Sequence, residues 1–262
     1  MSETYSTLTL SYEGALAVIT LNRPEKRNAI SYELINDVLR ALAEVEQSAP
    51  QIMILTGAGQ AFCSGMDLDN LRSITGRTAE ENQADSATMA LLFRTLYEFP
   101  KVTIAAVNGA AIAGGCGLAT LCDFTLASPQ AKFGYTEVKI GFVPAIVSAF
   151  LLRQVGEKQA RDLLFTGRII GADEAFRLGL VNEVVAEGKL MERARELAAS
   201  LLQNSPASLL ATKRLLSNYS SAALSVEIPI AVEENARIRA TEDFREGVSS
   251  FLEKRKPHWT GR

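Results

Sequence analysis

Two glycine-containing loops in this sequence could stabilise negative charge with main-chain groups. The first, Thr56–Leu71, reads TGAGQAFCSGMDLDNL, and the second, Asn108–Asp123, reads NGAAIAGGCGLATLCD. Glycine lets the backbone turn sharply and lets a ligand approach its N–H groups closely. The paired glycines of the second loop open a predicted helix containing Leu118, Leu121 and Cys122, and the first N–H groups of a helix are unpaired and partly positive. The loops therefore predict an oxyanion or anion site, although such glycines also serve turn geometry or tight packing.

The second loop also has some features of a dinucleotide-binding loop. Gly115 and Gly117 have the GxG spacing of that motif, and Glu137 lies twenty residues beyond Gly117, where the ribose-binding acid would stand. The third glycine is replaced by Thr120, and an Asn-Gly turn separates the loop from the preceding strand. The spacing therefore disfavours a dinucleotide site.

Few side chains in this sequence suit metal binding or nucleophilic relays. The only histidine is His258, in the terminal segment RKPHWTGR, so a zinc site or a Ser-His-Asp relay would depend on that one residue. Asp67 and Asp69 follow the first glycine loop, but they lack the glycine and the distal glutamate of a calcium loop. We therefore expect no metal site and no ordinary hydrolase chemistry.

The size, charge and composition of the chain are those of a soluble protein. Its 262 residues can bury the core of one large domain, and a content of 47% hydrophobic and 22% charged residues argues against disorder and coiled coil. The net charge is −3 and the basic residues form no long run, so the footprint of a nucleic-acid-binding protein is missing. The N-terminal MSETYSTLTLSYEG lacks the pattern of a secretion signal, and no apolar run approaches the roughly 18–20 residues of a membrane span. Three cysteines without a CxxC pair suggest a reducing compartment, so we expect a cytoplasmic protein that binds neither nucleic acid nor membrane.

Strand-like and helix-like segments alternate around the two loops. Residues 7–21 predict a β-hairpin, and Ser31 is a plausible cap for an amphipathic helix that ends before Pro50. Further segments are predicted as strands at Ile52–Leu55, Val102–Val107, Phe124–Ala127 and Val181–Val185, as a helix around Thr88–Glu98, and as helices alone from Lys189 onward. This alternation indicates an α/β fold in which helices cover sheets. Strand-like segments stop near residue 204, which predicts a core of residues 1–204 and a helical segment of residues 205–262.

Five segments of the chain resemble, in order and at the usual spacing, the signature blocks of the crotonase (enoyl-CoA hydratase/isomerase) family. They read ITLNRPEKRNAIS, ILTGAGQAFCSGMDL, VTIAAVNGAAIAGGCGLATLCDFTLAS, AKFGYTEVKIGFVP and ARDLLFTGRIIGADEAFRLGLVNEVV. The likeness covers about residues 8–186, and the tail EGVSSFLEKRKP is similar too. The resemblance implies a spiral of ββα turns with two roughly perpendicular sheets, followed by a C-terminal helical segment that supports a homotrimer. Trimers of this family often stack into hexamers.

The resemblance also implies an acyl-CoA thioester as the substrate. Matching positions place the two oxyanion-hole N–H groups on Met66 and Gly114, where they would stabilise the enolate-like charge that develops on the thioester oxygen. The blocks that run near coenzyme A contain the following candidate contacts: Lys26, Arg27, Ala61, Ser64, Asp67 and Leu68. Terminal basic residues could reach the nucleotide of a neighbouring subunit; these are Lys254, Arg255, Lys256 and Arg262. Coenzyme A is part of the substrate, so we expect no separate cofactor.

The reaction depends on the acid and base groups, and here the sequence departs from the family pattern. Hydratases of the family typically carry one glutamate shortly after the glycine-rich loop and a second about twenty residues later. The first position is Gly117 in this chain, and the second is Glu137. The run TEVKIGFVPAIVSAFLL looks more like 3-methylglutaconyl-CoA-type hydratases, which can also carry glycine at the first position, so it favours a hydratase.

Three activities remain open at this stage. With Glu137 as acid and base, the protein could hydrate a 2-enoyl-CoA, with an ordered water or another group in the missing partner's role. It could instead be an isomerase, in which Glu137 takes an α-proton and returns it at the γ carbon. It could also be an acyl-CoA-binding protein that kept the fold and lost the chemistry. The acyl pocket is expected from Arg72–Phe93 and Phe142–Phe150, and these segments do not reveal the acyl chain.

Overall fold

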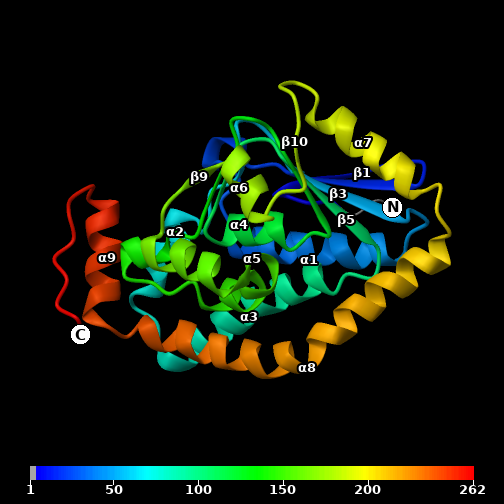
Figure 1. Ribbon diagram of the computed structural model, residues 1–262. Coiled ribbons are helices and arrows are strands. Elements are labelled where there is room, and N and C mark those ends of the chain that lie inside the picture. The colour runs from blue at the N-terminus through cyan, green and yellow to red at the C-terminus, as the bar shows by residue number, and fades with distance from the viewer. Residues whose placement is uncertain (1–3) are drawn as a thin grey trace.

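Two β-sheets organise the computed structural model of this chain, which describes residues 4–262 (Figure 1). The six-stranded sheet has the order β1 (Leu8–Glu13), β2 (Leu16–Leu21), β3 (Ile52–Gly57), β5 (Val102–Val107), β7 (Phe124–Ala127) and β10 (Glu183–Val184). The four-stranded sheet has the order β4 (Ala61–Cys63), β6 (Ala110–Ile112), β8 (Lys132–Gly134) and β9 (Ile170–Gly171). Successive pairs β3/β4, β5/β6 and β7/β8 each give one strand to each sheet, and neighbours within a sheet pair in parallel along this series. This repetition confirms the predicted spiral and the α/β fold class.

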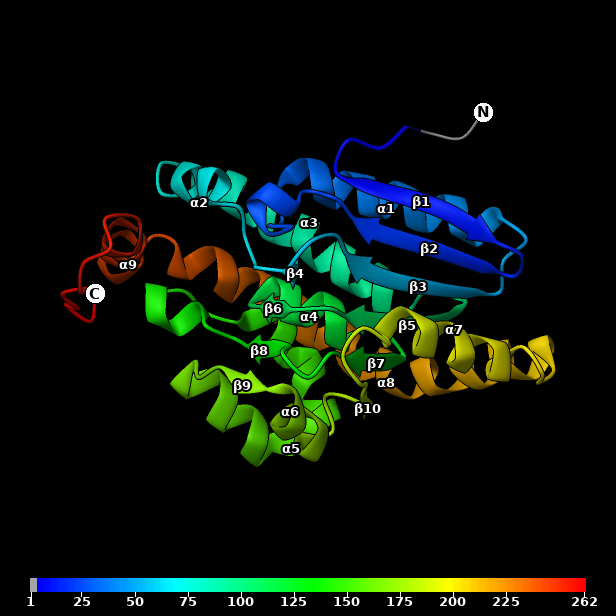
Figure 2. The same cartoon turned by 90° about the horizontal axis from the view of Figure 1, so that it is seen from above.

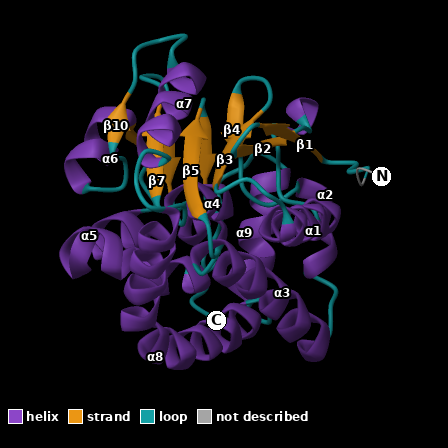
Figure 3. Ribbon diagram, turned by 90° about the vertical axis from the view of Figure 1, so that its right-hand side faces the viewer, coloured by secondary structure: helices purple, strands orange, loops and turns teal. Residues whose placement is uncertain are grey.

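Helices cover both faces of the six-stranded sheet. On one face, β2 and β3 pack on α1 (Tyr32–Gln47), α3 (Ala79–Tyr97) and α4 (Gly114–Thr120) in a single core, and on the other they pack on α7 (Leu190–Leu201). Figure 3 shows this arrangement, with α7 on the far side of the strands from α1 and α3. Before α7, the chain also forms the helical elements η1 (Pro24–Lys26), α2 (Leu68–Ile74), η2 (Glu137–Ile140), α5 (Ala145–Thr166) and α6 (Ala172–Leu178).

The N-terminal elements follow their sequence patterns closely. β1 and β2 form the predicted antiparallel hairpin, and α1 begins after Ser31, whose hydroxyl accepts a hydrogen bond from the Leu34 N–H. That bond satisfies one of the donors left over at a helix start. The helix ends at Gln47, before Pro50, as predicted.

Helix α3 is longer than the predicted segment Thr88–Glu98. It begins at Ala79 with a reciprocal capping box, in which Thr78 and Glu81 each bond the other's backbone N–H. The first half of α3 shows no apolar periodicity in the sequence because the residues that it buries are polar: Asn82, Asp85 and Ser86. These side chains bond residues near the end of a distant C-terminal helix, which no local pattern can reveal.

The two glycine loops contain short regular elements. The first holds β4 and ends at α2, and the second holds β6 and α4. Helix α4 stops at Thr120, so Leu121 and Cys122 follow it, contrary to the prediction. The strand predicted at Val181–Val185 is limited to the two residues of β10.

The C-terminal part of the chain is helical. After α7, helix α8 (Pro206–Ile238) runs along α3 and α5, and α9 (Glu242–Leu252) lies beside α2 and η2 (Figures 1 and 2). Helix α8 begins close to residue 205, but the division into a core and a trimerisation segment stays a prediction, and residues 1–3 of that core lie outside the described residues. Within residues 4–262, no helix is both long enough and apolar enough to cross a membrane.

Candidate active site

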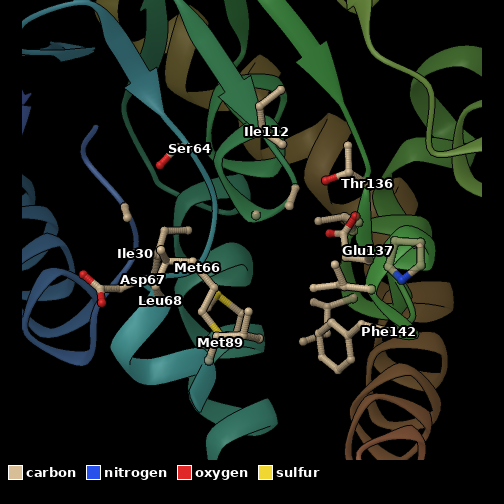
Figure 4. A pocket seen from close by; sticks show the side chains of 18 of the residues that line it. Ile30, Ser64, Met66, Asp67, Leu68, Met89, Ile112, Thr136, Glu137 and Phe142 are labelled. Atoms are coloured by element: carbon tan, nitrogen blue, oxygen red, sulfur yellow. The ribbon is translucent and has the colours of Figure 1, made fainter. Parts of the chain in front are cut away.

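A cavity of about 470 Å³ lies between the first glycine loop, the start of α4, η2 and the facing parts of α3 and α8 (Figure 4). Eight of the nine predicted site residues line it: Lys26, Arg27, Ser64, Met66, Asp67, Leu68, Gly114 and Glu137. The fold therefore brings together groups that lie more than a hundred residues apart in the sequence.

Ala61 is the one predicted site residue outside this cavity lining. It belongs to β4 and is buried, and its carbonyl accepts hydrogen bonds from the side-chain amides of Asn28 (2.8 Å) and Asn108 (3.4 Å). These bonds hold the first glycine loop against its neighbours. The predicted contact of Ala61 with coenzyme A stays a prediction.

The N–H group of Met66 is turned toward the cavity by a short strand pairing. The Ile30 N–H donates to the Gly65 carbonyl (2.7 Å), and the Asp67 N–H donates to the Ile30 carbonyl (2.9 Å). In an extended segment, the N–H of the intervening residue points to the opposite side. The Met66 N–H is therefore directed away from Ile30, and it has no acceptor among residues 4–262.

The N–H group of Gly114 is the first of helix α4 and has no partner within the described chain. The preceding residue, Ala113, has a φ of 52° and is held by a hydrogen bond from its N–H to the Gly134 carbonyl (2.7 Å). A Cβ on Gly115 would lie 2.2 Å from the Cys63 carbonyl oxygen, so only glycine lets the start of α4 lie against β4. This close approach brings the N–H groups of Gly114 and Met66 to one cavity.

Glu137 and Asp67 are buried carboxylates that line the cavity, and Asp67 is paired with Arg23. Glu137 opens η2, is 8% exposed, and its Oε2 atom has no hydrogen-bond partner within residues 4–262. Figure 4 shows its carboxylate directed into the cavity, with Thr136 beside it and Met66 and Met89 on the opposite wall. Burial raises the pKa of Glu137 to about 7, although its own backbone N–H favours the ionised form. Both protonation states are therefore accessible near neutral pH, which suits a group that takes and returns a proton.

The raised pKa of Glu137 predicts a pH-dependent cost to folding. Since the folded pKa of about 7 exceeds the ordinary 4.5, the folded state binds the proton more tightly, and the wild type loses stability as pH rises from about 4.5 through 7. At about 1.4 kcal/mol for each pKa unit, the loss above that range is about 3 kcal/mol. Glu137→Gln should therefore match the wild type in urea unfolding at about pH 4.5 and exceed it by about that amount at about pH 8.5. Equal stabilities at both pH values would contradict the buried-carboxylate assignment.

Position 117, where the family's first glutamate usually stands, is glycine here and is crowded by two neighbouring side chains. A Cβ on Gly117 would lie 2.9 Å from the Val147 Cγ1 atom and 3.2 Å from the Phe93 Cζ atom, and both of those side chains line the cavity. A side chain at position 117 would therefore require Val147 or Phe93 to shift. The position usually taken by the family's first glutamate carries no acid here, so Glu137 is the remaining carboxylate of that pair.

We expect Gly117→Glu to destabilise the protein without improving turnover. Overpacking a buried position typically costs about 1–3 kcal/mol, and a buried charge adds to that cost. Urea unfolding followed by circular dichroism measures the loss, and Gly117→Ala, which adds the same Cβ without a carboxylate, separates the crowding at Cβ from the cost of the charge. A variant of wild-type stability that turns over substrate faster would show that the cavity does accept a second carboxylate.

Some of the other predicted binding residues are already hydrogen-bonded or ion-paired within the chain, and others are exposed. The Asp67 carboxylate accepts from Arg23 (2.9 Å) and from the Asp69 N–H at the start of α2, so it holds the loop in place. Lys26 is exposed beside Asp69, at 3.5 Å, and remains accessible. Of the terminal cations, Arg255 is bonded to Glu246 and Glu253 within the chain. The roles of these residues toward coenzyme A stay predictions.

Several lining residues were not predicted as site residues. Met89, Phe93 and Phe142 fall in the segments expected to form the acyl pocket. Asn235 and Arg239, near the end of α8, were not anticipated, because they belong to no motif and follow the glycine loops by more than a hundred residues. Only the path of α8 along α3 brings them to the cavity.

Comparisons with known proteins agree with this fold and site. The family model described as enoyl-CoA hydratase/isomerase matches residues 11–262. A Thermus thermophilus protein provisionally named enoyl-CoA hydratase is 46% identical over 94% of this chain and 98% of its own length. A Clostridium acetobutylicum protein named short-chain-enoyl-CoA hydratase is 35% identical over 94% of this chain and 95% of its own.

A solved structure gives the same result. The crystal structure of an enoyl-CoA hydratase/isomerase from Xanthobacter autotrophicus Py2 superposes with a TM-score of 0.88 at 30% identity, covering 96% of this chain and 97% of that one. The fold is thus that of the crotonases. The chain belongs to the enoyl-CoA hydratase/isomerase family of enzymes, which confirms the predicted resemblance. The finer likeness to 3-methylglutaconyl-CoA-type hydratases stays a prediction.

Proposed function

We propose that this protein adds water across the double bond of a 2-enoyl-CoA thioester. The observation that carries the proposal is the pairing, in one cavity, of two unpartnered N–H groups on Met66 and Gly114 with the buried carboxylate of Glu137. The named hydratase activity of the Clostridium relative supports it. The Thermus relative's provisional name supports it in the same sense.

The proposed reaction uses one carboxylate for both protons. The N–H groups of Met66 and Gly114 bind the thioester oxygen, which draws electron density from the β carbon. Ionised Glu137 accepts a proton from a water molecule while the water oxygen bonds to the β carbon, and the double-bond electrons pass to the thioester oxygen as an enolate. Protonated Glu137 then gives that proton to the α carbon. The product is the 3-hydroxyacyl-CoA, and the carboxylate is regenerated.

The reaction consumes only the thioester and water, so it needs no metal or further cofactor. We propose that coenzyme A enters past Lys26 and Arg27, which line the cavity from the segment around η1. A cytoplasmic location fits the three cysteines, which are buried free thiols.

Isomerisation is the second candidate because a single carboxylate suffices to move a proton from the α to the γ carbon. The glycine at position 117, which leaves Glu137 without the family's usual partner, is the observation that favours it. Incubation with a 2-enoyl-CoA and, separately, a 3-enoyl-CoA distinguishes the activities by mass spectrometry and NMR. The hydratase forms a 3-hydroxyacyl-CoA from the 2-enoyl substrate. Double-bond movement without any alcohol would overturn the proposal in favour of the isomerase, and no turnover of either substrate would favour a binding protein.

We further propose that the protein assembles as a trimer or as a hexamer of two trimers. Large apolar side chains that one subunit leaves exposed support this: Phe165, Ile169, Phe176, Leu215, Leu216, Tyr219, Val226 and Ile230. Light scattering should give three or six times the chain mass of 28.3 kDa. A stable monomer at micromolar concentration that still turned over substrate would contradict the proposed assembly.

A further inference from the structure

We infer that the side-chain hydroxyl of Thr136 holds the attacking water beside Glu137, in the role of the acid that is missing at position 117. The inference rests on the proposed hydratase function and names a group that hydration needs in addition to Glu137. A water molecule with a single hydrogen bond to a carboxylate is still free to rotate. A second fixed partner is therefore needed to aim the water oxygen at the β carbon.

Thr136 and Ser64 carry the two side-chain hydroxyls in the lining of the cavity. Figure 4 shows Thr136 beside Glu137, with its hydroxyl directed into the cavity, and shows Ser64 on the opposite side, with the first glycine loop. The lining residues that follow Glu137 in this stretch are all apolar: Ile140, Phe142, Val143, Pro144, Ala145, Ile146 and Val147. Along residues 136–147, Thr136 is thus the one polar lining residue besides Glu137.

The Thr136 hydroxyl has no hydrogen-bond partner within the described chain. Thr136 stands at the N-terminal cap of η2, yet its side chain makes no capping bond, and its oxygen is not sealed in the interior. Of the two carboxylate oxygens of Glu137, Oε2 is sealed from solvent, whereas Oε1 is not, and Oε1 also has no partner among residues 4–262. Two free oxygens, one on a hydroxyl and one on a carboxylate, therefore reach the cavity from adjacent residues.

The positions of these two residues favour a bridging water over a direct hydrogen bond. Neighbouring residues on a helical turn do not face each other, and Thr136 and Glu137 form no direct side-chain bond in the described chain. A water molecule can bond two protein groups that are too far apart to bond each other. A water between Thr136 and Glu137 would have one hydrogen for each oxygen.

The backbone around Thr136 is held on both sides. The Gly134 carbonyl accepts from the Ala113 N–H (2.7 Å), and the Tyr135 side chain is buried in the core. The Thr136 carbonyl accepts from the Lys139 N–H (3.0 Å) in η2. Threonine has a short, β-branched side chain with few rotamers, so little entropy is lost in fixing its hydroxyl. The bond from Ala113 also ties this segment to the loop that presents the oxyanion donors.

In the inferred reaction, Thr136 accepts a hydrogen bond and transfers no proton. One O–H group of the water gives its proton to Glu137 while the water oxygen bonds to the β carbon, and the double-bond electrons pass to the thioester oxygen. The other O–H group donates to the Thr136 oxygen, and its proton stays on the new hydroxyl of the product. Isomerisation adds no water, so it has no need of Thr136.

Thr136→Val tests the hydroxyl because valine keeps the shape of threonine and lacks the oxygen. Hydration of but-2-enoyl-CoA is measured beside exchange of the α-hydrogens of butyryl-CoA in deuterated water, a step that uses Glu137 and the oxyanion hole but adds no water. We expect kcat for hydration to fall about tenfold to a hundredfold with little change in KM, and the exchange rate to stay within about threefold of the wild type.

Thr136→Ser is the matched control, because serine keeps the hydroxyl. It should recover most of the hydration rate. Thr136→Ala also lacks the hydroxyl and should behave like the valine variant, so a folding defect of either variant, seen by circular dichroism, leaves the other to decide.

The outcomes separate this inference from the proposed function. Wild-type kcat in a folded variant without the hydroxyl would overturn the inference, as would a serine variant no faster than valine. Equal losses of hydration and of α-exchange would also overturn it, because Thr136 would then act only on the placement of Glu137. A wild type that isomerised without hydrating would refute the proposed function and this inference with it. Hydration without α-exchange would contradict proton return by Glu137 alone, and the comparison of valine with serine would still decide the role of Thr136.

Discussion

Glu137→Gln is expected to lower turnover at least roughly a hundredfold while leaving the fold and the affinity for CoA thioesters intact. Glutamine has the same shape as glutamate but cannot accept and return a proton. Both proposed reactions route their proton through this carboxylate, which is buried, free of hydrogen-bond partners at Oε2 in the described chain, and poised by its pKa of about 7. The measurement is the initial rate with a 2-enoyl-CoA, read as kcat and KM separately.

The matched control for this variant is Glu25→Gln. Glu25 also lines the cavity, but it is exposed, and it belongs to η1, which lies far from Glu137 in the sequence. Its replacement should leave kcat near the wild-type value. If Glu137→Gln left hydration and isomerisation unchanged, neither mechanism would survive, and an acyl-CoA-binding protein would become the better interpretation.

Gly114→Pro is expected to lower turnover by roughly a hundred- to a thousandfold. Proline lacks the N–H that should bind the thioester oxygen, and loss of one oxyanion-hole donor typically costs about 2.7–4 kcal/mol of transition-state stabilisation. Proline is tolerated in the first position of a helix, which is where Gly114 stands. It does restrict the preceding residue, and Ala113 has an unusual φ of 52°, so circular dichroism and unfolding curves must accompany the kinetics.

Gly114→Ala separates the lost donor from the added side chain. Alanine keeps the N–H, and its Cβ would meet the end of the Ile30 side chain at 3.1 Å and the Phe93 ring at 3.5 Å, contacts that a small adjustment can relieve. The alanine variant should retain most of the activity. A folded proline variant with nearly full activity would show that Gly114 is not an oxyanion-hole donor.

Much of this fold and site could be predicted because the relevant signals are local. The hairpin of β1 and β2, the Ser31 cap and the glycine loops each depend on neighbouring residues, and the structure reproduces them. The approach of Gly115 to Cys63 shows why glycine is needed at the start of α4. Local chemistry is what a single sequence reports best.

Features that depend on distant packing could not be predicted. The sequence shows that position 117 lacks a carboxylate, but only the structure shows that Val147 and Phe93 crowd this position. The first half of α3 is polar because it meets Asn235 and Arg239 from α8, a contact across about 150 residues. Such long-range pairs leave no periodic pattern in either segment.

The central claim is that one carboxylate, on one wall of the cavity, moves both protons of hydration. Because Glu137 takes the proton from water and returns it to the α carbon, the hydroxyl and the new hydrogen must be added to the same face of the double bond. Hydration of a 2-enoyl-CoA in deuterated water, followed by NMR of the 3-hydroxyacyl product, measures this directly. We predict one diastereomer, with deuterium at the α carbon and the hydroxyl on the same face. Addition to opposite faces, or an equal mixture of diastereomers, would contradict a single-carboxylate mechanism.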